Sequence, residues 1–267
     1  MENISVTPFN VGYLRFDLSE IYNLPDDHQF AGQVADIPMF SFHIGLPGRS
    51  VLVDAVDYDL QEIPPAFQVL GYEPPADLLQ QLEAKRIDAA EISDVIITHA
   101  HFDHYGALSA VVSGRRQPAF PRARHYLSKA DWHPKRFDAM DERTLGLVEQ
   151  HGLLALTRGE ISLGDGLTIL PMPGETPGHQ VLCLEVGTKS IYFAGDLYHH
   201  PLEFVDAARN VSWASVKKMG KSKLAFMKSM AGSGGLAYFT HIMSAHRVDE
   251  QEAGTHTWQR ADAAVND

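Results

Sequence analysis

The stretch IITHAHFDHYGAL, residues 96–108, places three histidines and an aspartate within six residues, directly after an apolar run. The preceding Val and Ile residues are typical of a short buried strand. Side chains two positions apart on a strand face the same side, so His99 and His101 can bind one ion. Asp103 and His104 follow where the chain turns away and can bind a second ion. Clustered imidazoles repel when protonated and are costly to bury, so the stretch predicts a metal site rather than core packing.

Strand-like and helix-like segments alternate in a mixed order around this stretch, which favours sheets covered by helices. We expect one domain over residues 1–267, built from two similar halves, with a polar end that frays from about Val248. The expected strands are 5–16, 38–46, 50–56, 93–101, 166–173, 180–187, 190–196 and 234–243. The expected helices are 74–87, 105–114, 132–152 and 212–230. We expect the pocket to be built by 22–40, 132–150 and 198–232.

The bulk properties narrow the class of protein. The formal net charge is −12, which disfavours binding to nucleic acid or to anionic membranes. No apolar run approaches the length of a membrane span, and the N-terminus lacks a signal peptide pattern. The single cysteine, Cys183, lies in an apolar run and is expected to be a buried, inert thiol. These features predict a cytoplasmic protein acting on a small molecule, with a monomer and a homodimer both left open.

The motif H-A-H-F-D-H after an apolar strand resembles the HxHxDH motif of the metallo-β-lactamase superfamily. That family also has a histidine after a turn, an aspartate after a strand and a last histidine near the C-terminus. In this chain the segments GETPGHQ, YFAGD and YFTHIM supply His179, Asp196 and His241 in that order. The resemblance implies an α/β fold, the four-layer αββα sandwich.

The resemblance also implies two divalent metal ions. His99, His101 and His179 would bind the first ion, and Asp196 would bridge the two. The second ion would be bound by three residues: Asp103, His104 and His241. Imidazole and carboxylate ligands without thiolate suit zinc, and also manganese, iron or cobalt.

By this likeness the protein is a hydrolase in which a metal-bridging hydroxide attacks a small ester-like substrate, most simply a lactone. Asp103 would move the proton, and Tyr198, two residues after the bridging aspartate, would polarise the carbonyl or merely line the pocket. Asp54 would either orient a metal ligand or simply end a strand. The remaining candidates are expected to be structural or surface histidines: His43, His125, His133 and His246.

Other reactions stay open at this point. GDLYHHP resembles the group that includes methyl parathion hydrolase, so an organophosphate is an alternative substrate, and a thioester is another. An iron-dependent oxidoreductase of the persulfide dioxygenase kind is the alternative of another class. The fold alone does not decide between them.

Overall fold

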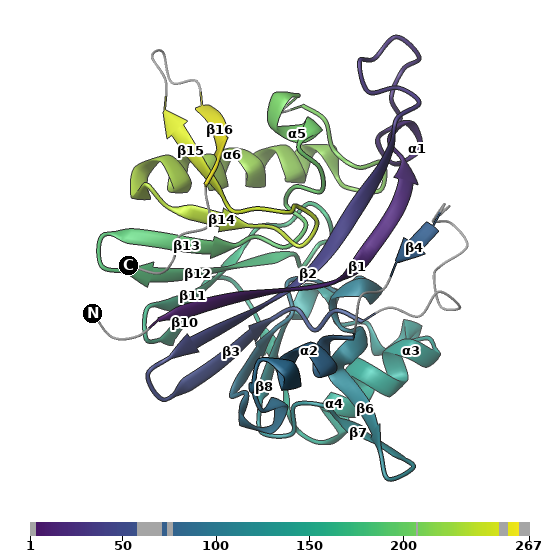
Figure 1. Ribbon diagram of the computed structural model, residues 1–267, viewed down its shortest axis with the longest axis vertical. Helices are drawn as coiled ribbons and strands as arrows, with labels where there is room; N and C mark the ends of the chain where they lie inside the picture. Colours follow the sequence, from purple (N-terminus) through teal and green to yellow (C-terminus); the bar gives the residue numbers. More distant parts are fainter. Residues whose placement is uncertain (1–3, 58–70, 74–76, 207, 251–255, 262–267) are drawn as a thin grey trace.

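Two seven-stranded mixed sheets form the middle of the computed structural model, which describes residues 4–57, 71–73, 77–206, 208–250 and 256–261 (Figure 1). The first sheet has the order β4 (Gly71–Glu73), β1 (Ser5–Asp17), β2 (Val34–Leu46), β3 (Arg49–Val53), β5 (Asp94–Ile96), β8 (Arg124–Ser128), β9 (Leu154–Thr157). The second has the order β10 (Ile161–Gly164), β11 (Leu167–Pro171), β12 (Gln180–Val186), β13 (Lys189–Phe193), β14 (Leu236–Tyr238), β15 (His246–Glu250), β16 (His256–Arg260). Strands β3, β5, β8 and β9 run parallel, as do β13 and β14.

The two sheets pack face to face because their central strands are apolar on both sides. On β12, Leu182 and Leu184 join Phe42 of β2 and Phe193 of β13 in the core between the sheets. Cys183, between the two leucines, belongs instead to the core beneath the helices and is buried as expected. Because neighbouring strand residues point to opposite faces, strands buried on both sides read as continuous apolar runs.

Helices cover the outer faces of both sheets (Figure 1). On the second sheet lie α5 (Leu202–Val205) and α6 (Val216–Ser233), and α6 packs against β13 and β15. Beside the first sheet lie α2 (Leu78–Ala84), α3 (Ala139–Asp141) and α4 (Leu147–Gln150), while α1 (Leu18–Tyr22) follows β1. The expected αββα sandwich is therefore confirmed. None of the helices in the described part of the chain combines the length and apolar character that crossing a bilayer requires.

Three expectations about local structure were wrong. The segment expected to be a helix over 105–114 is a short 3-10 turn followed by a hairpin of β6 (Ser109–Val112) and β7 (Arg115–Pro118). Ser113 and Gly114 both have positive φ, as a tight hairpin turn requires. The helix expected over 132–152 is broken into short 3-10, α and π turns. Strand β14 is not the last, because β15 and β16 pair beyond it; residues 251–255 and 262–267 lie outside the described residues.

Candidate metal centre

The candidate ligands lie on loops at one edge of both sheets. The segment from His99 to His104 follows β5, Asp196 follows β13 and His241 follows β14. Gly195 has a φ of +52°, and a Cβ there would lie 2.8 Å from the Thr98 side chain. Only glycine tolerates this conformation and this close approach, so Gly195 brings the loops of the two sheets together.

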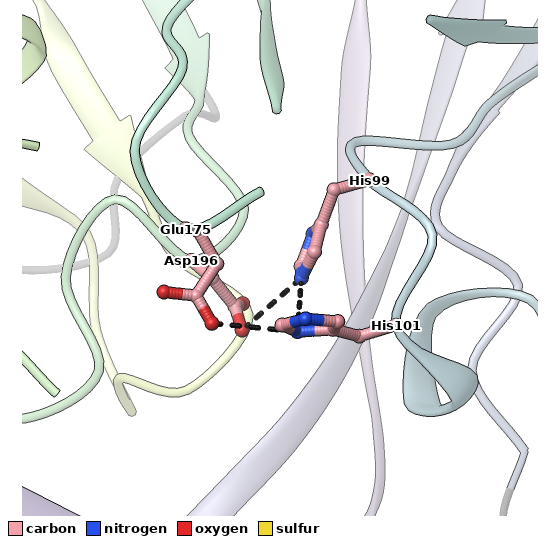
Figure 2. A group of neighbouring side chains, drawn as sticks. All are labelled: His99, His101, Glu175 and Asp196. Carbon is pink, nitrogen blue, oxygen red and sulfur yellow. Dashed lines mark hydrogen bonds and ion pairs between the residues drawn. The ribbon is translucent and has the colours of Figure 1, made fainter. Parts of the chain in front are cut away.

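The first group of possible ligands consists of His99, His101, Glu175 and Asp196, whose side chains point toward one another (Figure 2). His99 Nε2 lies 2.9 Å from His101 Nδ1 and 3.7 Å from Asp196 Oδ2. His101 Nδ1 lies 3.3 Å from Glu175 Oε1. Ligand atoms around one tetrahedral ion lie about 3.3 Å apart when metal–ligand distances are about 2.0–2.1 Å. The observed spacings bracket that value, so these residues fit one ion.

The second group consists of Asp103, His104 and His241, all buried. Asp103 Oδ2 lies 3.4 Å from His241 Nε2, and Asp103 Oδ1 lies 3.7 Å from His104 Nε2. Asp196 also faces this group, with Oδ1 3.3 Å from His104 Nε2 and Oδ2 3.2 Å from His241 Nε2. Its carboxylate therefore lies between the two groups.

The imidazoles are held in the tautomer that metal binding requires. Asp54 Oδ2 lies 2.9 Å from His104 Nδ1, and the carbonyl of Pro38 lies 2.8 Å from His241 Nδ1. When these rings are neutral and their Nδ1–H groups donate to these oxygens, Nε2 of each ring carries the lone pair that a metal ion needs. His104 Nε2 and Asp196 Oδ1 are buried without a hydrogen-bond partner among the described residues, as expected of metal ligands.

Asp54 thus does more than end a strand. Its carboxylate also accepts hydrogen bonds from the Thr98 backbone N–H at 2.8 Å and from the Thr98 hydroxyl at 2.9 Å. The backbone at Asp54 has a φ of 55°, which carboxamide and carboxylate side chains tolerate better than most. Asp54 therefore ties the loop after β3 to Thr98, which precedes His99, and to His104 of the second ligand group.

The buried carboxylates of the site favour positive charge on the groups around them. Burial alone would lower the pKa of His241, but the carboxylates of Asp196 and Asp103 raise it to about 9. Burial would likewise lower the pKa of His104, but the carboxylates of Asp196, Asp54 and Asp103 raise it well above its usual range. Burial and the neighbouring imidazoles lower the pKa of His99 instead. Carboxylates that draw protons onto buried imidazoles would be compensated equally by metal cations.

His179 lies beside the first group but outside it. Its ring centre is 5.2 Å from that of His99, its Nδ1 is 3.0 Å from the Met172 carbonyl, and its Nε2 accepts the Asp196 backbone N–H at 3.1 Å. The structure therefore brings it to the edge of the site and joins it to the backbone of the bridging aspartate. Its role as a metal ligand stays a prediction.

Tyr198 points away from the site. It packs against Phe204, Phe239 and Trp258, with the Lys223 ammonium 4.6 Å from its ring centre. The geometry therefore gives no support to carbonyl polarisation by Tyr198. The next residue, His199, faces the site instead, with Nε2 3.2 Å from Asp196 Oδ2.

Three residues near the ligands were missed from the sequence: Glu175, His199 and Trp213. Glu175 sits in a Gly- and Pro-rich turn, where a carboxylate reads as solvent-exposed. His199 lies in GDLYHHP, where no spacing assigns it a role, and Trp213 lies on no recognisable motif. Trp213 Nε1 donates a hydrogen bond to Glu175 Oε1. Of the histidines expected to be structural, His43 hydrogen-bonds Ser50, and His125, His133 and His246 belong to neither ligand group.

A pocket opens onto these ligands. Its polar side is formed by ligand-group residues and His199, and its apolar side by Phe102, Trp213 and residues of β1, α1 and β2. Of the three segments expected to build the pocket, 22–40 and 198–232 contribute lining residues and 132–150 does not. The lining residues are Leu14, Phe16, Ile21, Ile37, His101, Phe102, Asp103, Glu175, Asp196, His199, Trp213 and His241.

Comparisons with known proteins agree with this geometry. A family model described as "Metallo-beta-lactamase superfamily" matches residues 44–227, more than half of the chain. A "probable metallo-hydrolase" of Mycobacterium tuberculosis (strain ATCC 25618 / H37Rv) is 24% identical over 140 residues. That match covers 47% of this chain and 45% of the relative, so it spans about half the relative's length.

Two solved structures resemble the chain over almost its full length. The hydrolase AbOPH of the beta lactamase superfamily has a TM-score of 0.78 at 15% identity and covers 98% of this chain and 95% of its own. AidC, a dizinc quorum-quenching lactonase, has a TM-score of 0.74 at 17% identity and covers 98% of this chain and 96% of its own. At these identities the likeness shows the fold.

Proposed function

The chain belongs to the metallo-β-lactamase superfamily, and from this premise we propose that it hydrolyses a lactone or related carboxylic ester at a dinuclear metal centre. The observation that carries the proposal is the position of Asp196. Its Oδ2 faces His99 Nε2 at 3.7 Å and its Oδ1 faces His104 Nε2 at 3.3 Å. A carboxylate shared between two ligand groups can hold two metal ions side by side, as in a two-metal hydrolase. Zinc is the simplest choice of ion for such ligands, with manganese, iron and cobalt as alternatives.

Two bound ions would supply an activated water at neutral pH and polarise the oxygen of the substrate carbonyl. The chain would supply proton transfer through Asp103, which is buried and lines the pocket. Burial alone would raise the pKa of Asp103, but His104 and His241 hold it below its usual range. Asp103 is therefore ionised at neutral pH and able to take a proton and return it to the leaving alkoxide.

The apolar side of the pocket supports a substrate with an acyl or alkyl group. Leu14, Phe16, Ile21 and Ile37 face the polar ligands across the pocket, and burying aliphatic carbon against them would favour binding. The lactonase AidC has the same fold over 98% of this chain, which supports the lactone as the first substrate to test.

The test follows proton release by pH-stat with an acyl-homoserine lactone and metal-loaded protein. We expect turnover by the wild type and its loss in Asp103→Asn. The matched control is Asp138→Asn, because Asp138 is exposed and caps a short helix, a role that asparagine keeps. Metal analysis of Asp103→Asn distinguishes the two roles of Asp103: a variant that keeps both ions has lost only the proton transfer, and one that loses an ion has lost a ligand.

Other outcomes distinguish the alternatives. Absence of lactone hydrolysis by metal-loaded wild type would remove the lactone from the proposal. Release of the leaving group from a phosphotriester or a thioester would then identify an organophosphate or thioester hydrolase. Oxygen consumption with a persulfide by the iron-loaded protein would overturn the hydrolase class altogether.

A further inference from the structure

Glu175 is unusual because its carboxylate is fully buried and lies outside the ligand set that the sequence motif supplies. Its side chain is 0% exposed, and Oε2 has no hydrogen-bond partner among the described residues. In the described part of the chain, the basic side chains in contact with it are the imidazoles of His101 and His199, at 3.3 and 3.5 Å from Oε1. A buried carboxylate is costly unless a cation or several donors compensate it. Burial opposes protonation of His199, but the carboxylates of Glu175 and Asp196 raise its pKa well above the usual range, so His199 supplies one positive charge at Oε1 while Oε2 is left without a donor in the described part of the chain.

The position of Oε1 is that of a metal ligand. His99 Nε2 and His101 Nδ1 lie 2.9 Å apart, and Oε1 lies 3.3 Å from His101 Nδ1, close to the tetrahedral ligand spacing of about 3.3 Å. Figure 2 shows the Glu175 and Asp196 carboxylates on one side of the group and the two imidazoles on the other. All four ligand atoms lie within 4.8 Å of one another.

The surrounding structure holds this carboxylate in place. A Cβ on Gly174 would lie 2.6 Å from the Met219 Cα, so only glycine allows the turn to approach α6 this closely. Trp213 Nε1 donates to Oε1, and metal-binding carboxylates are usually oriented by such a hydrogen bond. His179, in contrast, uses Nε2 to accept the Asp196 N–H.

We propose that Glu175 is a ligand of the metal ion bound by His99 and His101, together with Asp196. This assignment rests on the dinuclear centre of the proposed function, but not on any particular substrate. A second carboxylate in the first group makes it harder and more negative than a group of imidazoles. Oxygen ligands suit manganese relatively better than imidazoles do, so Glu175 shifts the preference of this position toward manganese.

The experiment measures metal binding directly, without activity. Metal-free wild type, Glu175→Gln, Glu175→His and His179→Gln are titrated with Co²⁺ and with Zn²⁺. Stoichiometry is read by elemental analysis, affinity by competition with a chelator, and the Co²⁺ environment by visible absorption. Glu149→Gln is the matched control, because Glu149 is exposed on α4.

We expect two ions in the wild type and in the control. Glu175→Gln keeps an oxygen that can accept from Trp213 but loses the charge, so one of the two ions should bind at least about tenfold more weakly, with altered Co²⁺ absorption. Glu175→His should bind both ions with a different Co²⁺ spectrum, because imidazole is also a ligand.

The assignment would be overturned if Glu175→Gln bound two ions with wild-type affinity and an unchanged Co²⁺ spectrum while His179→Gln lost one. Glu175 would then be only an acceptor for Trp213. Failure of the wild type to bind a second ion is a different result. It would overturn the dinuclear centre, and Glu175→Gln against wild type would still decide the role of Glu175 at the remaining ion.

Discussion

Replacing His125 by leucine is expected to make the metal-free protein more resistant to acid. His125 lies on β8, is 0% exposed, and packs near Phe120 with ring centres 6.4 Å apart. Neither ring nitrogen has a hydrogen-bond partner among the described residues. Burial lowers the pKa of His125 to about 4, against weaker opposing contributions from the backbone of Ala123 and Leu153.

The size and sign of the effect follow from this shift. Above the ordinary histidine pKa of about 6.5, His125 is neutral in both states and does not contribute to pH dependence. As the pH falls below that value, the unfolded chain binds a proton that the folded chain does not, so stability is lost. The loss reaches about 2 kcal/mol near pH 5 and about 3 kcal/mol below pH 4, at about 1.4 kcal/mol per pKa unit. Leucine also removes an unpaired N–H, which should add about 1–3 kcal/mol at neutral pH.

The assay is urea unfolding of metal-free wild type and His125→Leu near pH 7.5 and near pH 5, with His133→Gln as a control at an exposed histidine. Other titrating groups act on both proteins, so the difference between them isolates His125. We expect the wild type to lose about 2 kcal/mol more than His125→Leu between the two conditions, and the control to follow the wild type. Equal losses in wild type and His125→Leu would refute the reasoning, since His125 would then be charged or hydrogen-bonded in the folded state.

Two further predictions concern the site. Asp54→Ala removes the acceptor at His104 Nδ1 and should weaken metal binding by about 10–100-fold, measured by chelator competition; affinity equal to wild type would mean that the backbone alone orients His104. Tyr198→Phe should keep kcat and KM within about twofold, because the ring packs in an aromatic cluster away from the ligands; a large fall in kcat alone would return Tyr198 to the reaction.

The parts of the site that could be predicted are those encoded by adjacent residues on or next to a regular strand. His99 and His101 lie beyond β5, which ends at Ile96, so the strand expected over 93–101 is too long and its two-residue period does not apply to them. The motif nevertheless brings them together, with His99 Nε2 2.9 Å from His101 Nδ1. Asp196 and His241 each follow a short apolar strand, which makes them recognisable as loop residues at a sheet edge. The central strands were predictable for a related reason, since strands buried on both faces are continuously apolar.

Glu175 could not be predicted because the residue it contacts, His101, lies on a segment far away in the sequence. It meets His101 across the gap between the two sheets, and nothing in its turn signals burial. The hairpin at 109–118 was missed for a local reason. Leu108, Val111 and Val112 satisfy a helical spacing as well as a strand, and only the positive φ of Ser113 and Gly114 decides between them.

His199, and not the predicted Tyr198, faces the ligands, which shows that residue spacing does not predict side-chain direction beyond the end of a strand. Gly195, two residues after the end of β13, has a left-handed conformation, so the residues after it follow neither the two-residue nor the 3.6-residue period. The backbone N–H of His199 donates to Glu203 Oε1 at 2.9 Å, and Lys223 pairs with Glu203 from α6. That buried pair fixes the turn so that Tyr198 enters the core and the imidazole enters the pocket. The side chain of Tyr198 is thus directed by a contact between Glu203 and Lys223 of α6, which lie 20 residues apart, and no count of residues along the chain expresses that contact.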